Sequence, residues 1–228
     1  MASGGGRAWR WWALAVVIVL LVAMAATLAI WRPWESARED AAGERSVTLQ
    51  TLDGLEEVSG YSEARYDRDL FGQRWLDVDR NGCDTRNDIL GRDLAEPVFK
   101  ENTNDCKVLS GTLTDPYSGE VVDFISGQNT SVLVQIDHVV PLAWAWRHGA
   151  ENWTMDRRAE FANDPRNLLA SSQEMNQSKG ASGPSAWLPP VRDLQCGYAE
   201  DWIEILDVYD LGVNAADRAT LEGVLLGC

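Results

Sequence analysis

Histidine and cysteine are scarce in this sequence of 228 residues, which has two histidines and four cysteines. No two cysteines have the C-x-x-C spacing that a structural zinc site would use. Disulfides are the better interpretation for a chain that leaves the cytoplasm. Of the three possible pairings we favour Cys83 with Cys106 and Cys196 with Cys228, because these close short local loops.

Basic side chains are also in short supply. The chain has 20 Lys+Arg against 35 Asp+Glu, a net charge of −15, and no acidic residue precedes Glu35. Phosphate affinity normally comes from Lys and Arg that displace counterions, so this charge argues against tight, site-specific binding of nucleic acid. The window 136–180 differs from the rest, because its basic and acidic residues nearly balance.

Charged residues are absent from Trp11 to Ile30, a run of membrane-spanning length. Arg7 and Arg10 precede this run, and the positive-inside tendency then predicts that the rest of the chain is exported. Two alternatives stay open. The segment is an uncleaved anchor, as its length favours, or a cleaved signal, because residues 23–25 fit a signal-peptidase site.

We therefore expect three parts: a signal or transmembrane anchor (1–34), a tether (35–60) and one folded domain (61–228). The tether is polar and alanine-rich, with no clear hydrophobic period. The remaining length suffices for one domain with its own core. The predicted location is the cell membrane with an extracytoplasmic domain, or the exterior if the segment is cleaved.

Local patterns predict an α+β domain. Asp84 suits the N-cap of a helix that extends to Leu94. β-forming residues on both sides of the turn-rich stretch 115–119 predict a β-hairpin. The remainder of the domain is expected to supply flanking helices.

The middle of the domain follows the order strand, long irregular insert, strand, helix. A strand over 132–136 ends just before the Asp-His pair 137–138, and a second strand spans 167–170. Ser171 and Glu174 have the spacing of a capping box for the helix that follows.

These elements carry residue types that suit phosphodiester hydrolysis, which needs a base for water and a cation that neutralises charge. Asp137 is a hard oxygen ligand suited to Mg²⁺, and the adjacent His138 is a base with an ordinary pKa near ~6.5. Asn176 offers a second oxygen ligand that brings no charge. Such a metal would keep coordination positions open for water and phosphate.

Three short stretches around positions 138, 167 and 176 together resemble the HNH endonuclease motif, whose letters fall on His138, Asn167 and Asn176. The pattern D-H, then N, then N-x-x-K, with nine positions from one Asn to the next, is similar to the HNH domain of RNA-guided CRISPR nucleases. Joined in this way, the motif is specific, whereas an isolated Asp-His pair is common.

This resemblance implies an HNH ββα-metal core, in which two strands and a helix surround one divalent metal, embedded in the mixed domain. Asp137 and Asn176 would bind Mg²⁺ or Mn²⁺, and His138 would activate water as the general base. Asn167 would brace the loop that bears the histidine, and Lys179 would contact substrate phosphate. The products would carry 5′-phosphate and 3′-hydroxyl ends.

The exported part also resembles a group of secreted bacterial HNH proteins related to the nuclease domain of GmrSD-type restriction enzymes. Beyond the central motif, the resemblance is carried by Tyr66, Arg68, Phe71, Gly72, Gly82, Cys83, Asp84, Thr85, Arg86, Leu90, Pro184, Trp187, Pro189, Pro190, Cys196, Gly197 and Tyr198. It implies a sequence-tolerant endonuclease whose partners are DNA, with RNA as a further substrate, and the membrane through the N-terminal helix. No protein partner is predicted.

A different class of function stays open: a catalytically silent, membrane-tethered binding or envelope protein, which the acidic composition would suit. The intact Asp137, His138 and Asn176 count against it. The second histidine, His148, is expected at the surface near a helix end, where it faces the carbonyl dipole.

Overall fold

The computed structural model describes residues 5–59 and 62–228, and their side chains except those of residues 5–10, 13, 15 and 25–41. Residues 60 and 61, where the predicted tether meets the predicted domain, lie outside the described part. The chain divides into two units, Met1–Val47 and Thr48–Cys228. Each unit is described by itself.

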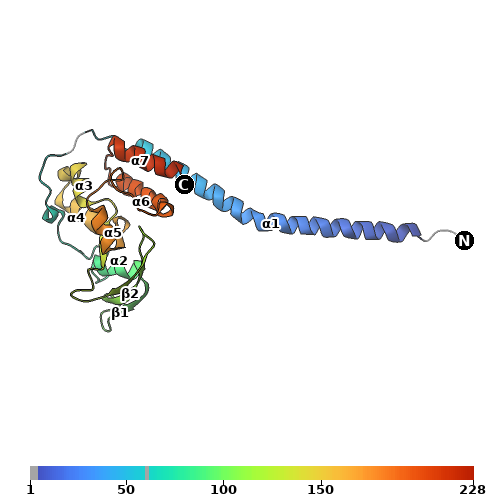
Figure 1. Cartoon of the computed structure of the whole chain (residues 1–228), viewed down its shortest axis with the longest axis horizontal. Coiled ribbons are helices and arrows are strands. Elements are labelled where there is room, and N and C mark those ends of the chain that lie inside the picture. Colours follow the sequence, from blue (N-terminus) through green and yellow to red (C-terminus); the bar gives the residue numbers. More distant parts are fainter. Residues whose placement is uncertain (1–4, 60–61) are drawn as a thin grey trace. The chain divides into compact units, whose positions relative to one another are not determined.

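From residue 5 onward, the first unit is part of one long helix, α1 (Gly5–Gly54), which continues into the second unit (Figure 1). No helix of the described residues is both long enough and apolar enough to span a bilayer. The predicted anchor, Trp11 to Ile30, falls partly on side chains that the structure does not describe. The membrane anchor therefore stays a prediction.

The segment expected to be a tether is helical as far as Gly54. Leu52 is buried, and Leu49 and Leu55 pack against the same core. Leu49 and Leu52 lie three positions apart on the helix and form an apolar stripe, which the polar composition of the segment as a whole conceals, and Leu55 follows the helix end. The guanidinium of Arg218 donates hydrogen bonds to the carbonyl oxygens of Leu52 and Leu55. The second unit thus begins earlier than the predicted domain.

The second unit combines short helices with two small antiparallel sheets, as the predicted α+β class requires. Its α-helices after α1 are α2 (Thr85–Asp93), α3 (Leu142–Arg147), α4 (Met155–Asn163), α5 (Gln173–Lys179), α6 (Gln195–Val208) and α7 (Ala215–Leu226), and its 3-10 turns are η1 (Arg68–Phe71), η2 (Ala150–Asn152), η3 (Pro165–Asn167) and η4 (Arg192–Leu194). Helices α6 and α7 lie side by side, and α2 lies against the β1–β2 region (Figure 1).

The larger sheet has the order β1-β2-β3, formed by β1 (Ala95–Phe99), β2 (Val108–Thr114) and β3 (Val121–Ile125). Strands β2 and β3 form the predicted hairpin around 115–119. The smaller sheet pairs β4 (Val134–His138) with β5 (Leu168–Ser172). Strand β5 leads directly into α5, so two antiparallel strands and a helix occur in the predicted order. The segment between β4 and β5 is not irregular as predicted, because it contains α3, α4 and the turns η2 and η3.

Two hydrophobic clusters meet at the end of β4. Val134 and Ile136 belong to a smaller cluster that includes residues of α2 and the larger sheet. The next two apolar residues, Val139 and Val140, belong to a larger cluster formed mostly by the helices and their aromatic side chains. His138 therefore sits where the chain passes from one core to the other.

Several local expectations hold, and others are wrong by one or two residues. The strand predicted over 132–136 is observed at 134–138, so Asp137 and His138 lie within β4 rather than just after it, and the strand predicted over 167–170 is observed at 168–172. Asp84 caps α2, and its side chain accepts a hydrogen bond from the Asn87 main-chain nitrogen. The cap of α5, however, is Ser172 rather than the predicted Ser171. Ser171 is still in the strand, where its hydroxyl donates to Asp115 instead, because strand alternation points it toward the hairpin turn.

The cysteines form two disulfides, Cys83–Cys106 and Cys196–Cys228, and these are the pairs favoured on loop length. The first joins the loop before α2 to the loop before β2, and the second joins the first turn of α6 to the end of the chain. No described cysteine is free.

Replacement of Leu52 by alanine tests whether the end of α1 belongs to the folded unit. We expect Leu52→Ala to lower the free energy of unfolding by about 2–5 kcal/mol, the usual cost of truncating a buried leucine. The control is Val47→Ala, because Val47 is 62% exposed and its truncation should be nearly neutral. Urea unfolding followed by circular dichroism measures both. Equal stabilities of the two variants would mean that this segment is a tether after all.

Candidate active site

The end of β4 distributes its side chains between two faces. Because strand side chains alternate, Gln135 and Asp137 face one side, whereas Ile136 and His138 face the other. Helix α5 packs against β4 and β5, and its Asn176 reaches Gln135. Asp137 therefore shares a face with α5, and the imidazole of His138 points away from it.

Asp137 is buried and makes two strong interactions. The Lys179 ammonium lies 2.9 Å from one carboxylate oxygen and 3.2 Å from the other. The Tyr117 hydroxyl donates a hydrogen bond of 2.7 Å to the same carboxylate. An unpaired carboxylate would be costly at this depth, so both partners are needed.

Lys179, predicted to contact phosphate, is fully buried. Its ammonium also donates to the main-chain oxygen of His138 over 2.7 Å. Burial lowers the pKa of Lys179, and the Asp137 carboxylate opposes that shift. In this arrangement the ammonium is turned toward protein oxygens, so a phosphate contact would require it to leave them. That role stays a prediction.

Tyr117 is a site residue that the sequence analysis missed. Burial raises its pKa well above 10, and the Asp137 charge raises it further, so the phenol stays protonated and donates. Its ring makes edge-on contacts with Trp187 and Tyr198, at centroid distances of 5.2 and 5.7 Å. Trp187 and Tyr198 both belong to the family pattern, and that pattern was the signal that could have indicated a site residue here. Tyr117, the residue that they contact, lies far from both in the sequence.

Asp115 holds the hairpin turn that carries Tyr117. Its carboxylate accepts hydrogen bonds from the main-chain nitrogens of Tyr117, Ser118 and Ser172. Burial alone would raise the pKa of Asp115, but these bonds stabilise the charged form and hold the pKa below its usual value. One carboxylate thus ties the β2–β3 turn to the junction of β5 and α5.

Asn176 and Asn167 have different surroundings. The Asn176 side-chain nitrogen donates to the Gln135 side-chain oxygen over 2.7 Å, and Asn176 is half-buried. Asn167 is fully buried, its side-chain oxygen accepts from the Val140 nitrogen, and its main-chain oxygen accepts from the Val139 nitrogen. Asn167 therefore holds the residues just after His138, which is the position that a bracing role would need.

The His138 ring has one nitrogen fixed and one available. Its Nε2 lies 2.9 Å from the carbonyl oxygen of Ala162, and since a carbonyl only accepts, Nε2 carries the hydrogen. No hydrogen bond to Nδ1 occurs within the described part of the chain. Burial lowers the pKa of His138 to about 4; the bond to Ala162 opposes this, and Arg68 and Lys179 add to the lowering. The ring is therefore neutral near pH 7, with a lone pair on Nδ1.

Arg68 lies close enough to His138 to affect its pKa, although the sequence analysis gave it no role. Turn η1 carries Arg68 and packs on α4 through Phe71, which is buried and contacts Phe161. The Arg158 guanidinium also donates to the Leu70 carbonyl. Since α4 ends beside Ala162, η1 brings a guanidinium to the imidazole face of the strand.

The carboxylate oxygens of Asp137 and the main-chain oxygen of His138 are hard ligands, and all of them lie within hydrogen-bond distance of the Lys179 ammonium. Asp137 and the His138 carbonyl already surround a positive charge, and Asn176 lies on the same face. The described residues contain no cluster of three or more His, Cys, Asp or Glu that could hold a metal. A divalent ion would therefore rely on Asp137, Asn176 and water, and it would displace Lys179.

The second histidine does not lie at the surface, as was expected from the sequence. His148 is buried rather than at the surface. Its ring stacks on Trp144 at 3.5 Å, and its Nδ1 pairs with the Trp144 carbonyl oxygen. His148 is the C-cap of α3, and the residues on both sides of it in sequence, Trp146 and Ala150, belong to the larger cluster.

These elements define a mixed α+β protein with small antiparallel sheets and a strand-end Asp-His pair. Residues 84–220 match the family described as GmrSD restriction endonucleases, C-terminal domain. The match covers more than half of the chain, and the chain therefore belongs to this family.

A relative from Arthroderma benhamiae is 38% identical over 185 residues, which is 80% of this chain and 85% of the relative. It is described as an uncharacterized secreted protein. This relative is fungal, so the bacterial origin implied by the resemblance is not supported by it. No solved structure matches the chain.

The protonation state of His138 can be measured in the metal-free protein. Since the folded pKa of about 4 is below the ordinary 6.5, the ring should remain neutral, with hydrogen on Nε2, from pH 7 down to about pH 5. Nitrogen chemical shifts of ¹⁵N-labelled histidine measure this. The unfolded chain binds the proton more readily, so stability from this residue is present above pH 6.5 and is lost as the pH falls toward 4. A His138 pKa at or above 6.5 would contradict the geometry.

Proposed function

We propose that this protein is a metal-dependent endonuclease that hydrolyses phosphodiester bonds of DNA, with RNA as a further substrate, outside the cytoplasm. The observation that carries the proposal is the His138 ring at the end of β4, whose Nε2 is held by the Ala162 carbonyl oxygen while Nδ1 has no hydrogen-bond partner among the described residues. The preceding residue, Asp137, is the metal-ligand candidate, and its side chain leaves the strand on the opposite face. Membership of a restriction endonuclease domain family supports nuclease activity.

In the proposed reaction His138 acts as the general base. Its Nδ1 takes a proton from water while the water oxygen forms a bond to phosphorus. The bond from phosphorus to the 3′-oxygen breaks, and that oxygen takes a proton from solvent. The products are a 5′-phosphate and a 3′-hydroxyl, and the histidine returns its proton to solvent.

Asp137 and Asn176 would hold Mg²⁺ or Mn²⁺ in this proposal. When bound, the ion would neutralise charge on the phosphate and on the departing oxygen. Asn167 would keep His138 in position through Val139 and Val140. The Lys179 ammonium, once displaced from Asp137, would contact the substrate phosphate.

The proposed location follows from three features of the chain. The relative from Arthroderma benhamiae is secreted, and both disulfides suit an oxidising compartment. The apolar run from Trp11 to Ile30 would direct export, as an anchor or as a cleaved signal. The low basic charge favours a sequence-tolerant enzyme over a site-specific one.

The competing proposal is a binding or envelope protein without activity. It is favoured by the buried Lys179–Asp137 pair, which fills the cation position in the protein by itself. Plasmid nicking and metal binding separate the two proposals.

Plasmid nicking by the full chain in mild detergent, with Mg²⁺ or Mn²⁺, tests the activity. We expect His138→Ala to nick about 10²- to 10⁴-fold more slowly, the usual contribution of a general base. EDTA should abolish nicking by the unaltered protein. In His138→Gly, added imidazole should restore part of the rate, which a merely structural loss would not allow. Nicking that is equally fast without His138, or absent with every metal, would favour the binding protein.

Lys179→Met tests the metal position without any measurement of activity. The change leaves the Asp137 carboxylate buried without a counter-charge, so we expect stability to fall by about 3–5 kcal/mol. If Asp137 binds the metal, Mn²⁺ should raise the unfolding midpoint of this variant more than that of the unaltered protein. The matched control is the Asp137→Asn/Lys179→Met double variant, which should gain nothing from Mn²⁺. A similar gain in the double variant would place the ion elsewhere.

A further inference from the structure

Two sequence patterns, 66–72 and 82–86, are not used by the proposed reaction, and both lie next to one groove. The groove has a volume of about 370 Å³, and its walls come from residues 73–75, the first turns of α2, the start of β2 and the segment between β3 and β4. Its charged lining residues are Arg74, Arg86, Lys107 and Asp84. Three cations and one carboxylate thus face a cavity in a chain whose net charge is −15.

The single carboxylate is already engaged. Asp84 accepts a hydrogen bond of 3.0 Å from the main-chain nitrogen of Asn87 and one of 2.7 Å from its side-chain nitrogen. These bonds cap α2 and hold the carboxylate at the helix start. The groove keeps an excess of positive charge, which favours an anionic ligand.

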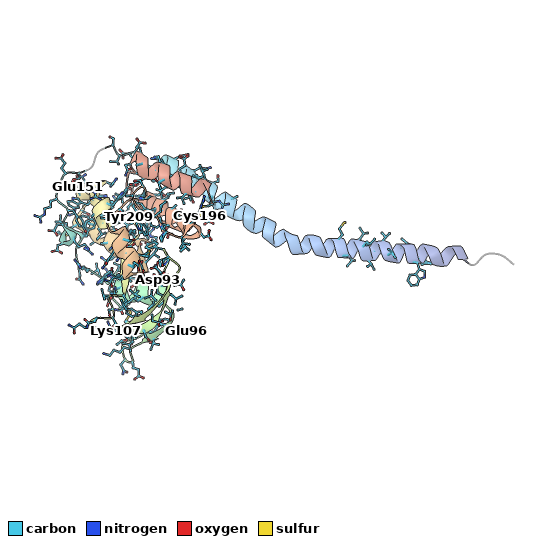
Figure 2. The ribbon with its side chains drawn as sticks, in the orientation of Figure 1. Asp93, Glu96, Lys107, Glu151, Cys196 and Tyr209 are labelled. Atoms are coloured by element: carbon cyan, nitrogen blue, oxygen red, sulfur yellow. A yellow bond between two sulfur atoms is a disulfide. The ribbon has the colours of Figure 1, made fainter. Side chains whose placement is uncertain are left out.

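The cations have two different roles. The Arg86 guanidinium is half-buried, donates to the carbonyl oxygens of Ser131 and Val134, and lies 6.0 Å from the Trp75 ring centre. It is a fixed part of the wall. Arg74 and Lys107 are exposed, and within the described residues their side chains make no hydrogen bond or ion pair. Figure 2 labels Lys107, just before β2.

The groove is joined to the His138 site by a buried amide. Asn163 accepts a hydrogen bond from the Leu76 nitrogen and donates one to the Gln73 carbonyl oxygen, so it clamps the loop that carries Arg74. Asn163 directly follows Ala162, whose carbonyl oxygen holds the His138 ring. Arg68 and Arg74 both lie near Tyr66, where each opposes the rise in the tyrosine pKa that burial causes. Arg68 also lowers the pKa of His138. Positive charge therefore extends from the imidazole to the groove.

We propose that this groove binds the phosphate backbone of the substrate strand beside the bond that His138 would hydrolyse, through Arg74 and Lys107 on the wall that Arg86 fixes. The proposal rests on the proposed function, because it takes a nucleic acid as the ligand. It explains how a strongly acidic protein holds a polyanion: Arg74 and Lys107 are exposed cations on one groove, and Asn163 ties the loop that carries Arg74 to the segment that holds the His138 ring. Contacts of this kind carry no sequence information, which agrees with a sequence-tolerant enzyme.

Binding in EDTA tests the groove independently of cleavage. The probe is fluorescein-labelled single-stranded DNA of about 20 nucleotides, which is longer than a typical single-strand site. The full chain, in mild detergent, is titrated at about 50 to 200 mM salt by fluorescence anisotropy. The test variant is Arg74→Gln/Lys107→Gln, the charge-matched control is Arg147→Gln/Arg192→Gln, and Arg74→Lys/Lys107→Arg keeps both charges.

We expect the test variant to bind about tenfold or more weakly and its salt slope to fall by roughly 1 to 1.5, as loss of two phosphate contacts predicts. The charge-keeping variant should bind as the unaltered protein does. Equal affinities and slopes in the test variant and the charge-matched control would overturn the proposal, and so would absence of binding to the unaltered protein.

If the groove binds as expected while no metal supports nicking, the proposed catalysis fails and the groove stands. If nicking is found but the groove variants match their control, the groove alone fails.

Discussion

The buried ion pair between Lys179 and Asp137 is the interaction on which the arrangement of β4, β5 and α5 depends. Removal of two charges from water costs several kcal/mol each, and only good geometry with further hydrogen bonds repays that cost. Here the Tyr117 hydroxyl and the His138 carbonyl complete the set. Because each partner comes from a different element, the strand end, the helix and the hairpin turn must all take their places together.

Strand alternation then separates the two kinds of chemistry at the end of β4. Asp137 faces α5 and its ammonium, whereas His138 faces α4 and η1. Two adjacent residues thus have different surroundings: a carboxylate paired with a buried ammonium, and an imidazole whose pKa is lowered by burial and by nearby cations. The main-chain oxygen of His138 connects them, since it accepts a hydrogen bond from Lys179.

Residues that carry the family resemblance meet around this strand end although they lie far apart in the chain. Trp187 and Tyr198 pack edge-on against Tyr117 and hold its hydroxyl toward Asp137. Phe71, from the first part of the pattern, packs against Phe161 and so fixes η1 beside the histidine. These aromatic side chains therefore support the site.

The sequence by itself determined the local elements, the short-loop cysteine pairs and the order of strand, strand and helix, because these depend on propensities, caps and spacing within a few residues. It placed Asn167 next to the histidine loop but gave no reason to expect Lys179 in the interior, Tyr117 on Asp137 or Leu52 in the core. Only the tertiary structure decided those, since they depend on which faces of distant elements meet. The free energy of a buried charge, unlike that of a helix cap, is set by partners that the neighbouring sequence does not contain.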